Sequence, residues 1–189
     1  MLVVVNKKRL IAILVVAALV FAGLFCYGPV MRLAFPLKYR DEIMSSSAQY
    51  QLDPYLVMGV ISAESRFAED ARSHKDAHGL MQLKEDTAKW CVEQFDIQAD
   101  GDLYAPATNI HIGCAYLRYL IDTFDGEEDT ALAAYNAGQG NVRKWLSDPQ
   151  YSADGRQLSA IPFPETEQYV KKVRARSDIY RDLYGKEGE

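Results

Sequence analysis

The chain has 189 residues, of which 49% are hydrophobic and 25% charged, which suits one globular domain with one extra segment. Residues 1–31 hold three basic and no acidic side chains, so the remainder has 18 basic and 26 acidic residues, a net charge of −8. Such an acidic domain lacks the basic stripe that nucleic-acid binders carry, which argues against a nucleic-acid partner.

The extra segment lies at the N-terminus. Lys7, Lys8 and Arg9 precede an uncharged stretch, residues 10–31, that exceeds the roughly 20 apolar residues needed to cross a bilayer. The apolar part of a signal peptide is shorter and ends at small residues, which residues 24–29 do not offer. We therefore predict an uncleaved transmembrane anchor, with a cleaved signal peptide as the alternative.

The basic cluster before the span predicts a single-pass protein of the cell membrane with residues 1–9 in the cytoplasm. The rest of the chain is then extracytoplasmic. We expect a linker over 32–38, a globular domain over 39–184 and a tail over 185–189.

The globular part shows helical spacing almost throughout, and we find neither a strand pattern of useful length nor an internal repeat. The prediction is an all-α fold. Helices are expected over residues 39–51, 54–64, 79–95, 106–124, 130–136, 142–147 and 165–184.

Glu64 is the most informative residue of this pattern. It ends an apolar helix that begins behind Asp53-Pro54, a typical N-cap followed by a first-turn proline. Its spacing from Val57, Val60 and Ile61 places its carboxyl on the apolar face, where loss of water raises a carboxyl pKa. Such an acid can donate a proton near neutral pH. The alternative is a surface glutamate, or one paired with a neighbouring arginine.

Cys91 and Cys114 would face an oxidising compartment, where a disulfide is permitted. Two small buried thiols on packed helices are the other interpretation. No Cys-x-x-Cys spacing indicates a metal site.

Four short segments accompany Glu64 in chain order. They are Ala63-Glu64-Ser65-Arg66-Phe67, then Ser73 with Gly79-Leu80-Met81-Gln82-Leu83, then Ala134-Tyr135-Asn136-Ala137-Gly138, and then residues 161–166 with Tyr169-Val170. Together they resemble the catalytic (SLT) domain of the soluble lytic murein transglycosylase family, which is lysozyme-like. The resemblance covers about residues 39–184 and includes a further match at Asn109-Ile110, Gly113 and Tyr116-Leu117.

The resemblance implies an enzyme that cleaves the β-1,4 bond between N-acetylmuramic acid and N-acetylglucosamine in peptidoglycan. The muramyl C6 hydroxyl attacks C1 of its own sugar and leaves a 1,6-anhydro end. One carboxyl suffices when the substrate carries the nucleophile, so Glu64 would act first as acid and then as base. The acids that follow Glu64 most closely, Glu69, Asp70 and Asp76, lie in a polar loop without an apolar setting, so none of them is expected to act as a second catalytic acid.

The resemblance also implies substrate-binding roles, which are assigned to Ser73, Met81, Gln82, Tyr135, Asn136, Glu165 and Tyr169. Gln82 is expected to donate a hydrogen bond to a sugar oxygen. Tyr135 and Met81 could instead be core residues, Ser73 a turn former and Glu165 a favourable charge at a helix N-terminus.

The sequence departs from the family pattern at Asp76 and Glu85. Both positions lie beside the proposed chemistry, so we expect them to affect the shape of the loop and not the activity. His74 and His78 are four residues apart, but a zinc site needs a third protein ligand that the sequence does not supply. We predict no metal and no cofactor. Peptidoglycan glycan strands are the expected partner, and a hydrolytic muramidase of the goose-type lysozyme kind or a non-catalytic glycan-binding module are the alternatives.

Overall fold

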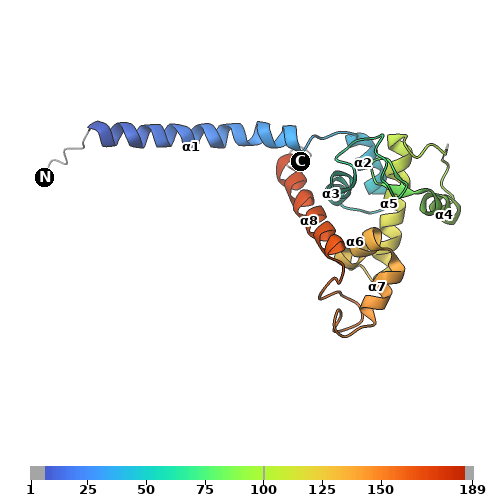
Figure 1. Cartoon of the computed structure of the whole chain (residues 1–189). Coiled ribbons are helices and arrows are strands. Elements are labelled where there is room, and N and C mark those ends of the chain that lie inside the picture. The colour runs from blue at the N-terminus through green and yellow to red at the C-terminus, as the bar shows by residue number, and fades with distance from the viewer. Residues whose placement is uncertain (1–6, 100, 186–189) are drawn as a thin grey trace. The chain divides into compact units, whose positions relative to one another are not determined.

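The computed structural model describes residues 7–99 and 101–185 and divides into two compact units, one ending at Leu37 and one beginning at Lys38 (Figure 1). Of the described elements, the first unit contains one helix and the second contains the rest. In chain order these are α1 (Lys7–Ala34), α2 (Arg40–Gln49), α3 (Pro54–Glu64), β1 (Ala77–His78), β2 (Leu83–Lys84), α4 (Glu85–Phe95), α5 (Pro106–Thr123), α6 (Glu128–Ala137), α7 (Gln139–Leu146) and α8 (Pro164–Tyr184).

Helix α1 extends beyond the predicted span of residues 10–31 at both ends. Its 28 residues include the basic cluster at its start and Pro29 near its end. Within the described part of the chain, it is the one helix long and apolar enough to cross a membrane, and its apolar window is fully exposed. A signal sequence near an N-terminus has the same properties.

Helix α3 begins and ends as the sequence predicts. The Asp53 carboxylate accepts a hydrogen bond from the Tyr55 amide at 3.0 Å, and Pro54 occupies the first turn, where no amide hydrogen is required. Every residue from Leu56 to Ala63 is buried, so α3 passes through the interior of the second unit. Glu64 is its last residue.

Helix α8 packs closely along α3. A Cβ atom on Gly59 would lie 2.2 Å from the Ser177 hydroxyl and 2.8 Å from the Val173 carbonyl oxygen, so a larger residue would force the helices apart. Tight packing of this kind fixes the position of the C-terminal end of α3 relative to α8.

The segment 79–84 differs from the prediction, which placed it in a helix. Ala77 pairs with Lys84 and His78 with Leu83 in a short antiparallel hairpin, and α4 begins only at Glu85. Gly79 and Gln82 both have positive φ angles, 71° and 49°, which a helix does not allow. Apart from this hairpin, the described elements are helices, and the all-α prediction is confirmed.

The fully buried Asn109 side chain of α5 holds the hairpin in place. Its amide nitrogen donates to the carbonyl oxygens of His78 at 3.0 Å and Leu103 at 2.7 Å, and its oxygen accepts from the Met81 amide at 2.7 Å. Because these bonds satisfy backbone groups inside the fold, the turn is fixed by a residue 28 positions further along the chain.

Cys91 and Cys114 are both fully buried free thiols. Burial raises the pKa of Cys91 to about 12, and it raises the pKa of Cys114 as well. The two cysteines therefore pack as small apolar side chains.

Candidate active site

The Glu64 side chain lines a cavity of about 370 Å³, which we call the cleft. The cleft lies where the end of α3, the hairpin, the end of α6 and the start of α8 come together, with α4 and α5 contributing further side chains. Its lining consists of Glu64, Ser73, His74, Lys75, Ala77, Gln82, Leu83, Lys84, Thr87, Tyr116, Tyr135, Asn136, Ala137, Gly138 and Glu165.

The pKa of Glu64 is raised from its ordinary value of 4.5 to about 7. Burial against the apolar end of α3 is the leading cause, because it disfavours the charged carboxylate. The Tyr169 hydroxyl and the Lys172 ammonium lower this pKa and so oppose the effect of burial only in part. Glu64 can therefore carry a proton near neutral pH, as the sequence predicts.

Two basic side chains of α8 bind the last carbonyl groups of α3. The Lys172 ammonium donates to the Ala63 carbonyl oxygen at 2.6 Å, and the Arg176 guanidinium donates to the carbonyl oxygen of Ser62 and, at 2.9 Å, to its hydroxyl. Carbonyls at a helix C-terminus lack intrahelical partners and carry partial negative charge, so both cations stabilise this end of the helix. They fix the backbone immediately before Glu64.

The sequence analysis missed Lys172 and Arg176. Their spacing contained a usable signal, since Lys172 follows Tyr169 by three residues and Arg176 follows Lys172 by four, which places them on one helix face. That face is the one turned toward α3.

Tyr135 and Tyr169 enclose the carboxyl of Glu64 within the protein. The Tyr135 hydroxyl donates to the Met81 carbonyl oxygen at 2.8 Å, which fixes the ring at the cleft wall. The Tyr169 hydroxyl is buried beside Glu64, and among the described residues no hydrogen-bond partner lies within normal geometry of it. Burial and the nearby Glu64 charge raise both tyrosine pKa values well above 10, so both hydroxyls stay protonated.

Ser73 and Gln82 line the cleft while also stabilising its loop. The Ser73 hydroxyl oxygen accepts from the Ala77 amide at 3.0 Å. The Gln82 amide nitrogen donates to the carbonyl oxygens of Ala71 at 3.0 Å and Gly79 at 2.8 Å. Because both of its N–H groups are used within the protein, Gln82 offers a ligand its oxygen as an acceptor, whereas the sequence suggested a donor.

Met81 is fully buried and is absent from the cleft lining in the described part of the chain. Its sulfur fills the space over Gly113, where an added Cβ would lie 2.3 Å from it. The side chain is therefore core packing, one of the two interpretations that the sequence left open. Its backbone carbonyl reaches the site indirectly, through Tyr135.

Asn136 and Glu165 also line the cleft. The Asn136 side-chain oxygen accepts from the Thr166 hydroxyl at 2.7 Å, which joins the end of α6 to the start of α8. Glu165 is exposed in the first turn of α8, where negative charge is favourable. The cleft thus holds two carboxyl groups in contrasting settings, one largely enclosed and one open to solvent.

Three other acids that are near Glu64 in the sequence do not line the cleft with it. Glu69 accepts a hydrogen bond from the Tyr39 hydroxyl at 2.7 Å, and Asp76 is paired with Arg72, which lowers the pKa of the Asp76 carboxyl. Neither these two nor Asp70 occurs in the lining of the cleft as the described residues form it.

His74 lines the cleft, whereas the largely buried His78 lies against the Tyr104 ring, with ring centroids 5.0 Å apart. Across residues 7–99 and 101–185, there is no cluster of three or more His, Cys, Asp or Glu side chains able to hold a metal ion.

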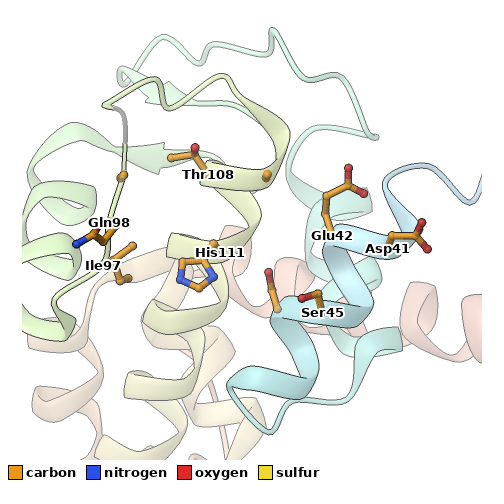
Figure 2. Close-up of a pocket in the computed structure, with 10 residues that line it drawn as sticks. Asp41, Glu42, Ser45, Ile97, Gln98, Thr108 and His111 are labelled. Atoms are coloured by element: carbon orange, nitrogen blue, oxygen red, sulfur yellow. The ribbon is translucent and has the colours of Figure 1, made fainter.

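A second and larger hollow, about 540 Å³, lies on another face of the same unit. Figure 2 shows Asp41 and Glu42 of α2 on one side of it and Thr108 and His111 of α5 on the other. The Asp41 side chain is exposed and the Glu42 side chain is partly exposed, and the His111 ring is hydrogen-bonded to the Tyr50 hydroxyl at 3.0 Å. This hollow offers polar contacts but no enclosed acid.

The family model of the transglycosylase SLT domain matches residues 41–157. The chain is 37% identical over 155 residues to the soluble lytic murein transglycosylase of Salmonella typhimurium, an alignment that covers 80% of this chain and 24% of that protein. It is 30% identical over 167 residues to the membrane-bound lytic murein transglycosylase C of Salmonella arizonae, covering 76% and 46%. The chain thus spans about a quarter of the length of its soluble relatives.

Solved structures show the same fold. An inactive glutamate-to-glutamine mutant of the lytic transglycosylase Slt from Pseudomonas aeruginosa matches with a TM-score of 0.73 and 34% identity over 82% of this chain and 26% of that one. A 70-kDa soluble lytic transglycosylase in complex with bulgecin A matches with a TM-score of 0.73 and 33% identity over the same shares.

Proposed function

Because this chain belongs to the transglycosylase SLT family, we propose that it cleaves peptidoglycan strands as a lytic transglycosylase, with Glu64 as its catalytic acid and base. The observation that carries the proposal is the setting of Glu64. An otherwise apolar helix ends in a single carboxyl group with a pKa of about 7, at the wall of a polar cleft.

In the first step, the Glu64 carboxyl protonates the glycosidic oxygen as its bond to C1 of the muramyl sugar breaks. In the second step, the C6 hydroxyl of the same sugar attacks C1 and gives its proton to the Glu64 carboxylate. A C6–O–C1 bond forms, the acid is restored, and no water is consumed. Because the nucleophile belongs to the sugar, the protein has only to hold the ring in position.

The cleft side chains support this sequence of steps. Tyr135 and Asn136 are held by hydrogen bonds to other parts of the fold, so they form fixed walls for a sugar ring. Gln82 presents an acceptor, and Ser73 has a hydroxyl hydrogen that can be donated. These groups suit the amide and hydroxyl groups of a saccharide.

Glu165 favours a second candidate, a hydrolytic muramidase. Glycosidases that use water pair an acid with a second carboxylate, and Glu165 shares the cleft with Glu64. Its exposed position leaves its charge solvated, which makes it a weaker activating base than an enclosed carboxylate. Transglycosylation therefore remains the preferred proposal.

We also propose that α1 anchors the protein in the cell membrane with the cleft on the extracytoplasmic side. The length and apolar character of α1 support the anchor, and the basic cluster at its start supports the orientation. The membrane-bound relative in Salmonella arizonae adds a precedent within the family.

The test is mass spectrometry of the muropeptides released from purified peptidoglycan by the full chain in detergent. We expect products with 1,6-anhydromuramyl ends, released about 10²- to 10⁴-fold more slowly by the Glu64→Gln variant. Reducing ends that disappear in a Glu165→Gln variant would replace the proposal with a muramidase. If the unaltered chain binds peptidoglycan but does not cleave it, the protein is a glycan-binding module and the proposal is wrong.

A further inference from the structure

A row of aromatic side chains leads out of the cleft across α4 and α5. Ring centroids are 5.4 Å apart for Tyr135 and Tyr116, 6.4 Å for Tyr116 and Trp90, and 4.7 Å for Trp90 and Tyr119. Phe95, at the end of α4, lies 5.7 Å from Trp90 and is 37% exposed. We call Tyr116, Trp90, Tyr119 and Phe95 the aromatic row.

The aromatic row lies outside the core. On the same two helices, the aliphatic side chains Leu117 and Leu120 are fully buried, as is Cys91. Trp90, by contrast, stays partly exposed, and so do both tyrosines of the row. The core is therefore filled by the aliphatic positions, and each ring of the row keeps part of its area at the surface.

Both helices connect the row to the cleft. Thr87 of α4 lines the cleft, and Trp90 follows it by three residues, one turn further along the same face. Tyr116 of α5 lines the cleft, and Tyr119 likewise lies one turn further along. A linear ligand that leaves the cleft on this side therefore meets Trp90 and Tyr119 next.

A further hollow of about 360 Å³ follows the row. Phe95 and Tyr119 line it, together with the ion pair of Arg118 and Asp122. The Tyr119 hydroxyl also lies 3.5 Å from the side-chain oxygen of Gln139. Hydrogen-bonding groups thus lie beside Phe95 and Tyr119 in the lining of this hollow.

This combination fits a saccharide. The faces of a pyranose ring carry C–H groups that stack on aromatic rings, while its hydroxyl groups project from the edge toward polar side chains. A protein partner would be expected to meet a patch with exposed aliphatic side chains as well, but Leu117 and Leu120 of this region are buried.

We propose that the aromatic row is a distal saccharide-binding subsite that holds sugars of the strand beyond those in the cleft. The inference rests on the proposed function, because it requires a glycan strand in the cleft. It goes beyond that function by adding binding energy that depends on strand length. Long strands should therefore bind more tightly than fragments that fill only the cleft.

The chain has two tryptophans, which allows a direct test. Trp145 of α7 packs against Phe163, with ring centroids 4.9 Å apart. In a full chain that carries Glu64→Gln and Trp145→Phe, Trp90 is the sole tryptophan, and cleavage is blocked. We expect long peptidoglycan strands to change the Trp90 fluorescence at saturation and a muropeptide disaccharide to leave it unchanged.

Matched variants then measure the contribution of the ring. In the Glu64→Gln background, Trp90→Ala should weaken the binding of long strands by about five- to tenfold and leave disaccharide binding unchanged, while Trp90→Phe should restore most of the affinity. The control is Lys89→Ala, next to Trp90 in the sequence. It should bind long strands as tightly as the Glu64→Gln protein does, because the exposed Lys89 side chain is paired with Glu85 at 2.6 Å and is not part of the row.

Three results would overturn the inference. One is unchanged Trp90 fluorescence while calorimetry shows that the strand is bound. Another is an equal loss of affinity for disaccharide and long strand in Trp90→Ala, which would mean a structural role. The third is a fluorescence change produced by another protein but not by strands. The proposed function would survive all three, whereas an unaltered chain that neither binds nor cleaves strands would refute both.

Discussion

The cleft and the hollow between α2 and α5 both contain carboxyl groups, but the two sites differ in how far those groups are enclosed by apolar side chains. The α2–α5 hollow is the larger and has two carboxylates, Asp41 and Glu42, on its rim. Asp41 is exposed and Glu42 is partly exposed, so water reaches and stabilises both charges. Glu64 instead ends a buried helix, and its pKa rises to about 7. The comparison teaches that enclosure by an apolar helix distinguishes an acid suited to catalysis from a surface carboxylate.

The strongest test of this contrast exchanges each acid for its amide. Glu64→Gln should reduce the rate of strand cleavage by about 10²- to 10⁴-fold, the usual contribution of a general acid or base. Glu42→Gln, in the other hollow, should leave the rate within about twofold of the unaltered chain, because surface changes away from such features have small effects. Release of muropeptides, followed by chromatography, measures both, and equal rates for all three proteins would remove the contrast.

The same pair of variants should differ in stability. Because the folded-state pKa of Glu64 lies above its unfolded value, the folded state binds more protons between the two values and loses stability as pH rises through that window. Glu64→Gln should therefore raise the free energy of unfolding by about 2 kcal/mol at pH of about 8, with little difference at pH of about 4. Urea unfolding at both pH values measures this.

Glu42→Gln is the control for this measurement, since Glu42 lies at the rim of the other hollow and stays partly exposed to water in the folded state. It should leave the free energy of unfolding nearly unchanged at both pH values. A Glu64→Gln variant that is less stable than the unaltered chain at the higher pH would contradict the account of burial.

The cleft and the α2–α5 region each contain a tyrosine whose hydroxyl is hydrogen-bonded. Removing each hydroxyl in turn shows which of the two regions affects the cleavage rate. Tyr135→Phe leaves the Met81 carbonyl without its partner at the cleft wall and should lower the cleavage rate by about tenfold. Tyr50→Phe breaks the bond to His111 in the other region and should leave the rate unchanged. Steady-state cleavage assays at matched folded fraction separate the two variants, and equal losses would indicate a general structural effect.

The smallest expected effect concerns the pH dependence of cleavage. Activity should fall as pH rises through the Glu64 pKa of about 7, because the first step needs the protonated acid. The Lys172 charge lowers this pKa, so Lys172→Met should move the fall upward by about half a pH unit. Lys171→Met should not, since Lys171 pairs with Glu167 at 2.5 Å. A downward movement in Lys172→Met would show the sign to be wrong.

Sequence alone predicted the features that depend on nearby residues. The cap at Asp53, the buried face of α3 and the place of Glu64 at its end all follow from spacing within one helix. The all-helical character of the domain and its family followed from periodicity and from short motifs in chain order. Six of the eight residues proposed for the site line one cleft, although their individual roles remain predictions.

Features that depend on distant residues could not be predicted. The chain forms a hairpin at 77–84 where the sequence predicted the start of a helix, because Asn109 binds the turn of the hairpin. The residues next to the turn contain no pattern that predicts this bond. Lys172 meets Ala63 across 109 positions of the chain. The inward orientation of Met81 depends on the space left by Gly113 in α5. Each of these needs the tertiary packing to be known.

The bond between Tyr39 and Glu69 has a mechanical consequence. If α1 is held in a membrane, any pull on the domain enters it at Tyr39, the residue before α2. The Tyr39 hydroxyl is bonded at 2.7 Å to Glu69, in the loop that runs from the end of α3 toward Ser73. Tension on the tether would thus be transmitted to the loop beside the cleft, and it would act on the position of Ser73 in the cleft lining.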